Sequence, residues 1–367
     1  MSRPVRVLAL ATNPLEGAST RFRVVQWAPR LERAGFRLRL DAFYSAVASR
    51  TIYRRGRSAA KAAHFLAGTF RRWRTLAVAG QGADLLLVHR ESLPFGWPAF
   101  LGRLRAFPGP VVYDYDDAMF LPQREGRGIL SRLERLGTPA EVMALSDGVL
   151  AGNEFLADYA RRHGRRVVLL PTCIDTDKFR PWEGPRPSGR CVIGWIGTHS
   201  TAKYLEDLLP LLERVAERYP AILSVIGGAT PFRGRALQVI HRPWSLEREV
   251  DDFRGCDVGV YPLWDDPWAH GKCGFKAIQF MACGVPVVAA AVGVNREIIE
   301  DGVNGFLAAT EAEWVEKLGW LLSDPALRDK LGRAGRRTVE ERYSLDAHQG
   351  TLVGTLRDVL ERAEPRR

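Results

Sequence analysis

Two lysines stand at the start of an apolar helical stretch in the second half of the chain, Gly271-Lys-Cys-Gly-Phe-Lys-Ala-Ile-Gln279. Glycines let the backbone approach a ligand closely, and Lys272 supplies a point charge for a phosphate. Lys276 follows four residues later, on the same helix face, where two like charges repel unless an anion lies between them. Gln279, one turn further on, can exchange a hydrogen bond with a sugar hydroxyl. This spacing indicates a phosphate at a helix N-terminus, and two solvated surface lysines are the alternative.

A loop of the same kind precedes a second helix, in Trp195-Ile-Gly-Thr-His-Ser-Thr-Ala-Lys203. The segment reads as the end of a strand, a hydroxyl-rich turn and the first turn of a helix. Hydroxyls, free helix N–H groups and a lysine meet there, which favours a bound phosphate. In the alternative interpretation, Ser200 or Thr201 only caps the helix and Lys203 is solvated.

Polar side chains also follow candidate strands in the first half of the chain. Asn13, Ser19, Thr20 and Arg21 come after the first strand, where they can contact a phosphate or an acceptor, although a solvated surface loop is an equally good reading. His89 ends another strand in His89-Arg-Glu and is a candidate for the acceptor side. A lone histidine is more often structural, so the sequence assigns it no catalytic role.

Three acids fall within four residues in Val111-Val-Tyr-Asp-Tyr-Asp-Asp117, at the end of a strand. Carboxylates this close repel one another unless something balances them. We therefore expect Asp116 or Asp117 to orient an acceptor hydroxyl. Two alternatives remain open, a divalent cation held by the Asp-x-Asp pattern and simple capping of the following helix.

Length and composition place these motifs in a folded, two-domain protein. A chain of 367 residues with 46% hydrophobic and 26% charged residues is too long for one ordinary core and too apolar for disorder. The five cysteines form no Cys-x-x-Cys pair, which argues against a disulfide framework or a zinc site and fits a reducing cytoplasm. No apolar run approaches the roughly 20 residues of a membrane-spanning helix, and the first apolar run is too short for a signal peptide.

The net charge of +11 is concentrated in one segment. Residues 42–83 contain no acid, and their basic residues include Arg50, Arg54, Arg55, Arg57, Lys61, Arg71, Arg72 and Arg74. Phe65, Leu66, Phe70 and Trp73 lie between them. This pattern over residues 50–74 is suited to an anionic membrane surface, so we expect a cytoplasmic protein that lies peripherally on the inner face of the membrane. A solvated helix face is the alternative, and nucleic acid is not the expected partner.

Apolar runs alternate with helical patterns over nearly the whole chain. The candidate strands are residues 5–11, 38–43, 84–89, 110–114, 148–152 and 166–170, then 191–197, 222–226, 237–240, 257–262, 285–290 and 305–308. Continuous apolar strands separated by helices predict parallel sheets covered on both faces. The proline- and glycine-rich residues 181–189 read as a linker. We expect an α/β protein with two Rossmann-like, doubly wound domains and a cleft between them.

The last part of the chain is predicted to be helical. Thr310-x-x-Glu313 is a capping box, Asp324-Pro325 begins a second helix, and residues 344–362 form a third. The expected domains are residues 1–180 and 190–343, with residues 344–367 as a C-terminal helix that packs back on the first domain.

The second half resembles the C-terminal domain of family 4 retaining glycosyltransferases (glycosyl transferases group 1), which have the GT-B fold. The resemblance is carried by Val258-Gly-Val-Tyr-Pro-Leu-Trp-Asp-Asp266, by Gly271 to Ala290, and by Val292-Gly-Val-Asn-Arg-Glu-Ile-Ile-Glu-Asp-Gly-Val-Asn-Gly-Phe-Leu307. It covers roughly residues 190–345. It is weaker in the first half, where Asn153, Leu170-Pro-Thr-Cys-Ile-Asp175 and Asp114-Tyr-Asp-Asp117 resemble family segments.

Two departures from the family pattern concern the donor. Many members carry Glu-x7-Glu where this chain has Gly271 and Gln279. Gln279 can keep a hydrogen bond to a ribose, but Gly271 cannot replace a carboxylate. Many members also have an arginine where Thr198 stands, while the lysine that follows is retained as Lys203. These substitutions leave the identity of the transferred sugar open.

The resemblance implies transfer of a sugar from a nucleotide-sugar donor to a hydroxyl acceptor with retention, without a cofactor and without a required metal. Expected catalytic residues are Lys272, Lys203, Glu297, Asp116 and Asp117. Expected donor-binding residues are Gly197, Thr198, Ser200, Thr201, Gly271, Cys273, Gly274, Phe275, Lys276 and Gln279. Expected acceptor-side residues are Asn13, Ser19, Thr20, Arg21, His89 and Asn153. The alternatives are an epimerase or phosphorylase of the same fold, and a non-catalytic binding protein.

Overall fold

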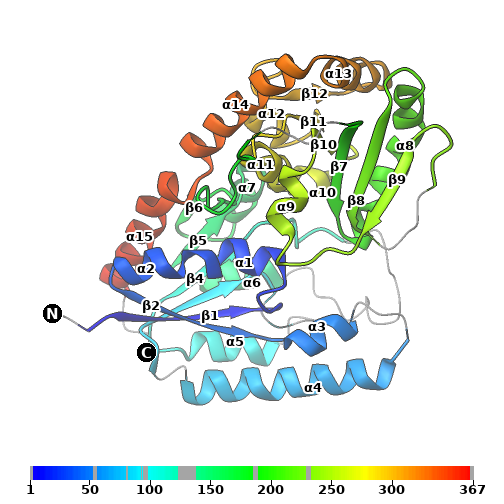
Figure 1. Ribbon diagram of the computed structural model, residues 1–367. Helices are drawn as coiled ribbons and strands as arrows, with labels where there is room; N and C mark the ends of the chain where they lie inside the picture. The colour runs from blue at the N-terminus through cyan, green and yellow to red at the C-terminus, as the bar shows by residue number, and fades with distance from the viewer. Residues whose placement is uncertain are drawn as a thin grey trace. The chain divides into compact units, whose positions relative to one another are not determined.

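The computed structural model of the chain describes residues 3–52, 56–79, 82–91, 93, 98–122, 138–184, 189–228 and 233–363. These residues form two compact units (Figure 1). Unit 1 holds Met1–Cys173 and His348–Arg367, and unit 2 holds Ile174–Ala347. Arg54 and Arg55 of the basic segment, and residues 185–188 of the expected linker, lie outside the described residues.

Unit 1 is built on a six-stranded parallel sheet in the order β2-β1-β3-β4-β5-β6. Its strands are β1 (Val5–Ala11), β2 (Phe36–Ala42), β3 (Leu85–His89), β4 (Val111–Tyr115), β5 (Gly148–Ala151) and β6 (Val167–Leu169). Its helices are α1 (Ala18–Arg23), α2 (Ala28–Arg33), α3 (Ala46–Ile52), α4 (Ser58–Arg74), α5 (Pro98–Arg105), α6 (Thr138–Leu145) and α7 (Glu154–Arg161). Strands β3, β4 and β5 are buried throughout, because helices cover both faces of a parallel sheet.

Unit 2 repeats the plan with a second six-stranded parallel sheet, in the order β12-β11-β10-β7-β8-β9 (Figure 1). Its strands are β7 (Cys191–Gly197), β8 (Ala221–Gly227), β9 (Gln238–Arg242), β10 (Val258–Tyr261), β11 (Val287–Ala290) and β12 (Phe306–Ala308). Its helices are α8 (Ala202–Ala216), α9 (Glu249–Arg254), α10 (Pro267–His270), α11 (Phe275–Ala282), α12 (Asn295–Ile298), α13 (Glu311–Ser323) and α14 (Pro325–Arg342). Apolar residues of α8 and α13 pack on the strands and form the core.

The expected secondary structure is confirmed. Each of the twelve strands predicted from the sequence is present, with bounds that differ by no more than two residues. The Thr310 capping box makes both of its hydrogen bonds at the start of α13, and Asp324 caps α14. These elements were predictable because apolar runs and caps act within a few residues along the chain.

The last helix, α15 (Leu345–Arg362, red in Figure 1), starts at the end of unit 2 and belongs to unit 1 from His348 onward. The guanidinium of Arg357 donates to the carbonyl oxygen of Ala34 at 3.1 Å, and Asp358 forms an ion pair with Arg166 at 3.2 Å. The division between the units falls after Cys173, a few residues before the expected end of the first domain at residue 180.

The strand orders define the place in each unit where a ligand is expected. In unit 1 the chain goes from β1 to one side of the sheet for β2 and to the other side for β3. In unit 2 the same reversal separates β7 from β10. Loops at the carboxyl ends of such neighbouring strands diverge, and this switch point is where doubly wound sheets bind ligands.

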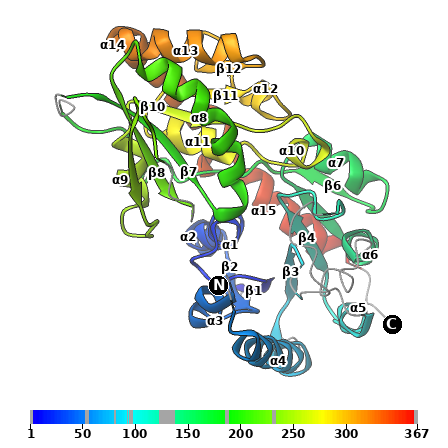
Figure 2. The ribbon, with the colours of Figure 1, turned by 90° about the vertical axis from the view of Figure 1, so that its right-hand side faces the viewer.

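The basic segment of the sequence forms α3 and α4, which lie side by side in unit 1 (Figures 1 and 2). Arg71, Arg72 and Arg74 occupy the last turn of α4. Among the described residues, no helix combines the length and the hydropathy that a membrane crossing requires.

Candidate functional site

The loop after β7 presents hydroxyl groups at the switch point of unit 2. The Thr198 and Ser200 side chains are exposed, and their hydroxyl oxygens lie 3.0 Å apart. Thr201 accepts a hydrogen bond from the Thr198 backbone N–H at 3.0 Å, so part of the expected capping is present. Gly197 is required here, because a Cβ atom would lie 2.3 Å from the Trp195 ring. The loop therefore combines a cap with hydroxyls that remain open to solvent.

Lys203 is held against aromatic rings in the first turn of α8. Its Nζ lies 4.6 Å from the centre of the Trp264 ring and 5.4 Å from that of Tyr204. Trp264 follows β10 and donates its indole N–H to Asp207, one helical turn beyond Lys203, at 2.7 Å. Contact between a cation and an aromatic face positions the ammonium group without removing its charge. The Lys203 charge thus lies where the segments after β7 and β10 meet.

The second loop expected to bind a phosphate follows β10 and α10. Lys272 lies in it with its Nζ 5.8 Å from the centre of the Trp268 ring. Gly274 has a φ of +61° and precedes α11, which begins without a side-chain cap. The left-handed glycine turns the chain just before the helix N-terminus, a common arrangement for binding an anion. It also means that Lys272 lies outside α11, so the expectation that Lys272 and Lys276 share a helix face is wrong.

Gln279 does not face the place where a ribose was expected. Its side chain is 0% exposed, and its Oε1 accepts a hydrogen bond from Lys276 Nζ at 2.9 Å. Lys276 in turn lies over the Phe253 ring. The prediction that Gln279 contacts a ribose directly is therefore wrong. Helix α11 directs this side chain into the interior of unit 2, where it orients Lys276.

The loop after β11 lies against the loop that precedes α11. A Cβ atom at Gly274 would lie 2.2 Å from Ile298 Cδ1 and 3.2 Å from Asn295 Oδ1. Asn295 is buried, donates to the Ala290 carbonyl oxygen at 2.9 Å, and has no hydrogen-bond partner for Oδ1 among the described residues. Sequence reasoning missed Asn295, although it stands in the quoted Val292-Gly-Val-Asn segment. Glu297, two residues on, is exposed at the same sheet edge.

Unit 1 brings together four residues at its own switch point. His89 Nδ1 lies 2.7 Å from Asp114 Oδ2, and His89 Nε2 lies 2.8 Å from Ser19 Oγ. Ser19 also donates to the carboxylate of Asp116 at 2.8 Å. Strand β3 supplies the histidine, β4 and its following turn supply the two acids, and α1 supplies the serine. The expected His89, Ser19 and Asp116 are thus neighbours.

Arginines balance the acids of this cluster. Arg23 forms a buried ion pair with Asp114, and Arg90 pairs with Asp116 and, at 3.5 Å, with Asp117. Burial acts to raise the pKa of Asp114, but the Arg23 charge and the His89 hydrogen bond outweigh it and lower the pKa. Burial opposes the Arg90 charge in the same way at Asp116, whose pKa lies well below its ordinary value. Both side chains are therefore carboxylates at neutral pH.

The arrangement Ser19–His89–Asp114 has the connectivity of a nucleophilic triad, but its charges do not suit one. An attacking serine must develop negative charge on Oγ, and here the Asp116 carboxylate lies within hydrogen-bond distance of that atom. Like charges disfavour such ionisation. The cluster is suited instead to fixing the loop after β1 and to accepting hydrogen bonds. Arg23 was not singled out from the sequence, since its partner is 91 residues away.

Other residues predicted for the acceptor side have structural partners. Asn153 caps α7 by accepting a hydrogen bond from the Leu156 N–H at 2.8 Å. Arg21 is buried and donates to the Leu15 carbonyl oxygen at 3.1 Å. Thr20 is buried as well, whereas Asn13 is partly exposed in the loop after β1. The geometry therefore favours structural roles for Asn153 and Thr20 over the direct acceptor contacts that were expected.

Within the described residues, no group of three or more histidine, cysteine, aspartate or glutamate side chains is arranged to hold a metal ion. Asp116 and Asp117, for which a divalent cation was one alternative, face the Arg90 guanidinium instead. All five cysteines are free thiols.

Comparison with known proteins finds a family match within the second unit. Residues 190–324 match the family model of glycosyl transferases group 1. A D-inositol 3-phosphate glycosyltransferase of Xylanimonas cellulosilytica is 30% identical over 263 residues, which is 62% of this chain and 60% of that protein. The enzyme of the same name from Stackebrandtia nassauensis is 26% identical over 262 residues, covering 62% of this chain and 58% of that protein. The match thus spans about 60% of the length of these relatives.

Solved structures share the fold over almost the whole chain. Sucrose-phosphate synthase from Thermosynechococcus elongatus superposes with a TM-score of 0.71 at 17% identity, covering 99% of this chain and 100% of that structure. Anabaena HepE in complex with UDP gives 0.66 at 14% identity, covering 96% of this chain and 100% of that structure. The fold of the chain is therefore the GT-B fold of these glycosyltransferase structures, and its residues 190–324 match the family model of glycosyl transferases group 1.

Proposed function

We propose that the protein is a glycosyltransferase that moves a sugar from a nucleoside diphosphate sugar to a hydroxyl acceptor. The observation that carries this proposal is the placement of Lys203 and the exposed Thr198 and Ser200 hydroxyls after β7, and of Lys272 after β10, the two strands that flank the switch point of unit 2. The family match covers all of these residues, and the named relatives are glycosyltransferases. A structural neighbour holds UDP, which makes UDP the first nucleotide to test.

In this proposal unit 2 stabilises the leaving group. Departure of the nucleoside diphosphate builds negative charge on its phosphates. Lys203 and Lys272, with the uncapped N-terminus of α11, supply fixed positive charge for it. Charge already in place costs no reorganisation during the reaction, which is why such groups contribute strongly to catalysis. Glu297 supplies the carboxylate for the donor sugar, since Gly271 offers none.

Unit 1 is proposed to hold the acceptor. Asp116 and Asp117 are carboxylates beside Arg90 and can accept a hydrogen bond from an acceptor hydroxyl. We propose that transfer proceeds with retention of configuration, without a metal and without a covalent enzyme nucleophile. Incubation with EDTA should leave the rate unchanged, and NMR of the product should show the anomeric configuration of the donor.

The experiment that tests the function combines nucleotide binding with turnover. A thermal-shift screen against UDP, GDP, ADP, dTDP and CMP should show stabilisation by one nucleotide, because a ligand of the folded state raises the melting temperature. Lys272→Ala should lower kcat by about 100-fold or more, the loss seen when one transition-state charge donor is removed. The matched control is Lys330→Ala, an exposed lysine on α14. Equal activities of the two variants would exclude the role given to Lys272.

We also propose that the basic segment over residues 50–74 rests on an anionic membrane surface, which points to glycolipid or polysaccharide synthesis. The support is the charge of α3 and α4 together with exposed apolar residues, among them Leu66 and Phe70. Binding to anionic vesicles should weaken steeply as salt is added, because ions screen the charges.

A further inference from the structure

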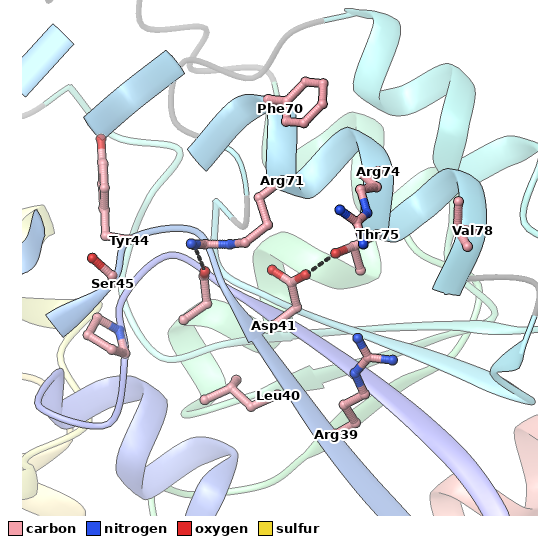
Figure 3. Close-up of a pocket in the computed structure, with 12 residues that line it drawn as sticks. Arg39, Leu40, Asp41, Tyr44, Ser45, Phe70, Arg71, Arg74, Thr75 and Val78 are labelled. Carbon is pink, nitrogen blue, oxygen red and sulfur yellow. Dashed lines mark hydrogen bonds between the residues drawn. The ribbon is translucent and has the colours of Figure 1, made fainter. Parts of the chain in front are cut away.

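A cavity of about 820 Å³ lies in unit 1, between β2 and the end of α4 (Figure 3). Its walls come from the second half of β2, the residues after it, the last turn of α4, the π-helical turn Thr75–Ala79, and Pro14 of the loop after β1. The cavity is separate from the His89 cluster, none of whose four residues lines it. Its volume is in the range of small-molecule sites.

Three arginines line this cavity, namely Arg39, Arg71 and Arg74. Arg71 donates to the carbonyl oxygens of Ala42 and Phe43, which are neutral partners. The side chains of Arg39 and Arg74 make no hydrogen bond or ion pair with any described residue. Three guanidinium groups thus surround one space, and like charges so gathered repel unless an anion joins them.

The acid in the wall, Asp41, does not neutralise these arginines. It pairs with the buried Arg72, whose Nε lies 3.3 Å from Asp41 Oδ1, and accepts a hydrogen bond from the Thr75 hydroxyl. Burial lowers the pKa of Arg72 to about 10, against the opposing charge of Asp41, so Arg72 remains charged at neutral pH. Asp41 and Arg72 therefore balance each other, and the cavity keeps the charge of its three wall arginines.

Apolar side chains stand exposed beside this charge. Phe70 and Val78 line the cavity and are 73% and 68% exposed. Leu66, one turn before Phe70 on α4, is 65% exposed. Large apolar side chains this exposed, next to a cationic site, match a ligand with an anionic head and an apolar tail.

We propose that this cavity binds the phosphate of a lipid headgroup, with Arg39, Arg71 and Arg74 contacting the phosphate oxygens and Phe70 and Val78 contacting the acyl or prenyl chain. Guanidinium groups match phosphate geometry with paired N–H donors. The inference rests on the proposed membrane contact and sharpens it. A diffuse basic surface becomes a defined site for a phosphorylated lipid.

The test compares two pairs of substitutions that remove the same charge. The cavity variant is Arg39→Gln/Arg74→Gln, and Arg71 is kept because it holds the chain after β2. The control variant is Arg37→Gln/Arg50→Gln, two exposed arginines of β2 and α3 outside the cavity lining. Unchanged thermal unfolding of both variants establishes that each is folded. Binding is measured to phosphatidylcholine vesicles that contain phosphatidic acid and, by calorimetry, to monomeric dihexanoylphosphatidic acid and to inorganic phosphate.

We expect the cavity variant to bind both lipid probes at least tenfold more weakly than the control variant. Phe70→Ser should weaken the binding of dihexanoylphosphatidic acid and leave the binding of inorganic phosphate unchanged. If the two variants lose vesicle affinity equally, as a non-specific attraction between surface arginines and anionic lipid would dictate, the cavity assignment is wrong while the membrane contact stands.

Two further outcomes separate the inference from the proposed function. If the wild-type protein does not bind vesicles but binds the monomeric lipid through Arg39 and Arg74, the proposed membrane contact is wrong and the proposed cavity site is supported. If inorganic phosphate binds as tightly as the lipid, the ligand is a soluble phosphate and the lipid assignment is overturned.

Discussion

Asp116 shows how single residues in unit 1 are kept charged. It accepts from Ser19, pairs with Arg90, and lies in the turn after β4. Arg90 reaches it from a left-handed backbone conformation with a φ of +53°. That conformation is costly for a residue with a side chain, so the ion pair and the turn must stabilise it. Strained residues of this kind gather at functional sites.

The depressed pKa of Asp116 makes a prediction about pH and stability. An unfolded aspartate has a pKa of about 3.9, so between that value and the lower folded pKa the unfolded state binds more protons. The stabilisation is therefore complete above about pH 4 and is lost as the pH falls through the folded pKa. Urea unfolding at a series of pH values should show that the free energy of unfolding falls less steeply with decreasing pH for Asp116→Asn than for the wild type.

The control for this experiment is Asp329→Asn. Asp329 is exposed on α14, and its side chain makes no hydrogen bond or ion pair with a described residue. It should keep the wild-type slope. An Asp116→Asn protein with the wild-type slope would mean that the ion pair with Arg90 does not stabilise the fold.

At the scale of elements, the start of α11 depends on one glycine. Gly274 has a left-handed backbone conformation, and its missing side chain leaves room for Val294, in the loop after β11, and for Ile298, the last residue of α12. The close packing of these two segments brings the loop after β11 beside the loop that precedes α11. A different residue here would disturb the backbone and the contact together.

Gly274→Ala should lower the free energy of unfolding by about 2 kcal/mol or more, from the left-handed conformation and the 2.2 Å contact with Ile298. Gly354→Ala is the matched control, since Gly354 is exposed within α15 and a Cβ atom there would meet nothing within 4 Å. The control should stabilise the protein by about 0.5–1 kcal/mol, because alanine favours helix. Chemical denaturation measures both. Equal effects of the two substitutions would contradict this account.

At the scale of the whole molecule, each unit has its own sheet and its own core, but unit 1 is completed by the far end of the chain. Leu352, Leu356 and Val359 of α15 are buried. A Cβ atom at Gly148 of β5 would lie 3.0 Å from Val359, which places α15 against that strand. The first and last parts of the sequence therefore stabilise each other.

Deletion of residues 348–367 should destabilise unit 1 selectively. The three buried side chains contribute about 1.5–3 kcal/mol each, so the loss is on the order of 5 kcal/mol. Calorimetry should show one transition at lower temperature and the transition of unit 2 unchanged. Leu356→Ala, which keeps the chain whole, should shift the same transition by less. A deletion that lowers both transitions equally would contradict the division into units.

Local patterns in the sequence were enough to predict the strands, the helix caps and the loops that carry polar residues. The apolar run at β3 and the capping box at Thr310 act within a few residues, so they can be read without knowing the fold. The resemblance to the family added the expectation that the loop at Lys272 binds the donor, which stays a prediction.

Side-chain partners over long sequence distances were decided by tertiary structure. Ser19 and Asp116 are 97 residues apart and meet because β1, β3 and β4 are neighbours in the sheet. Gln279 was expected to face a ribose, yet the orientation of α11 turns it inward. The cavity beside Arg39 exists only where β2 and α4 meet. The sequence by itself determined which elements form and which residue types stand at their ends, because those rules are local. Only the tertiary structure decided which of these residues meet, because strand order and helix orientation depend on the packing of each unit as a whole.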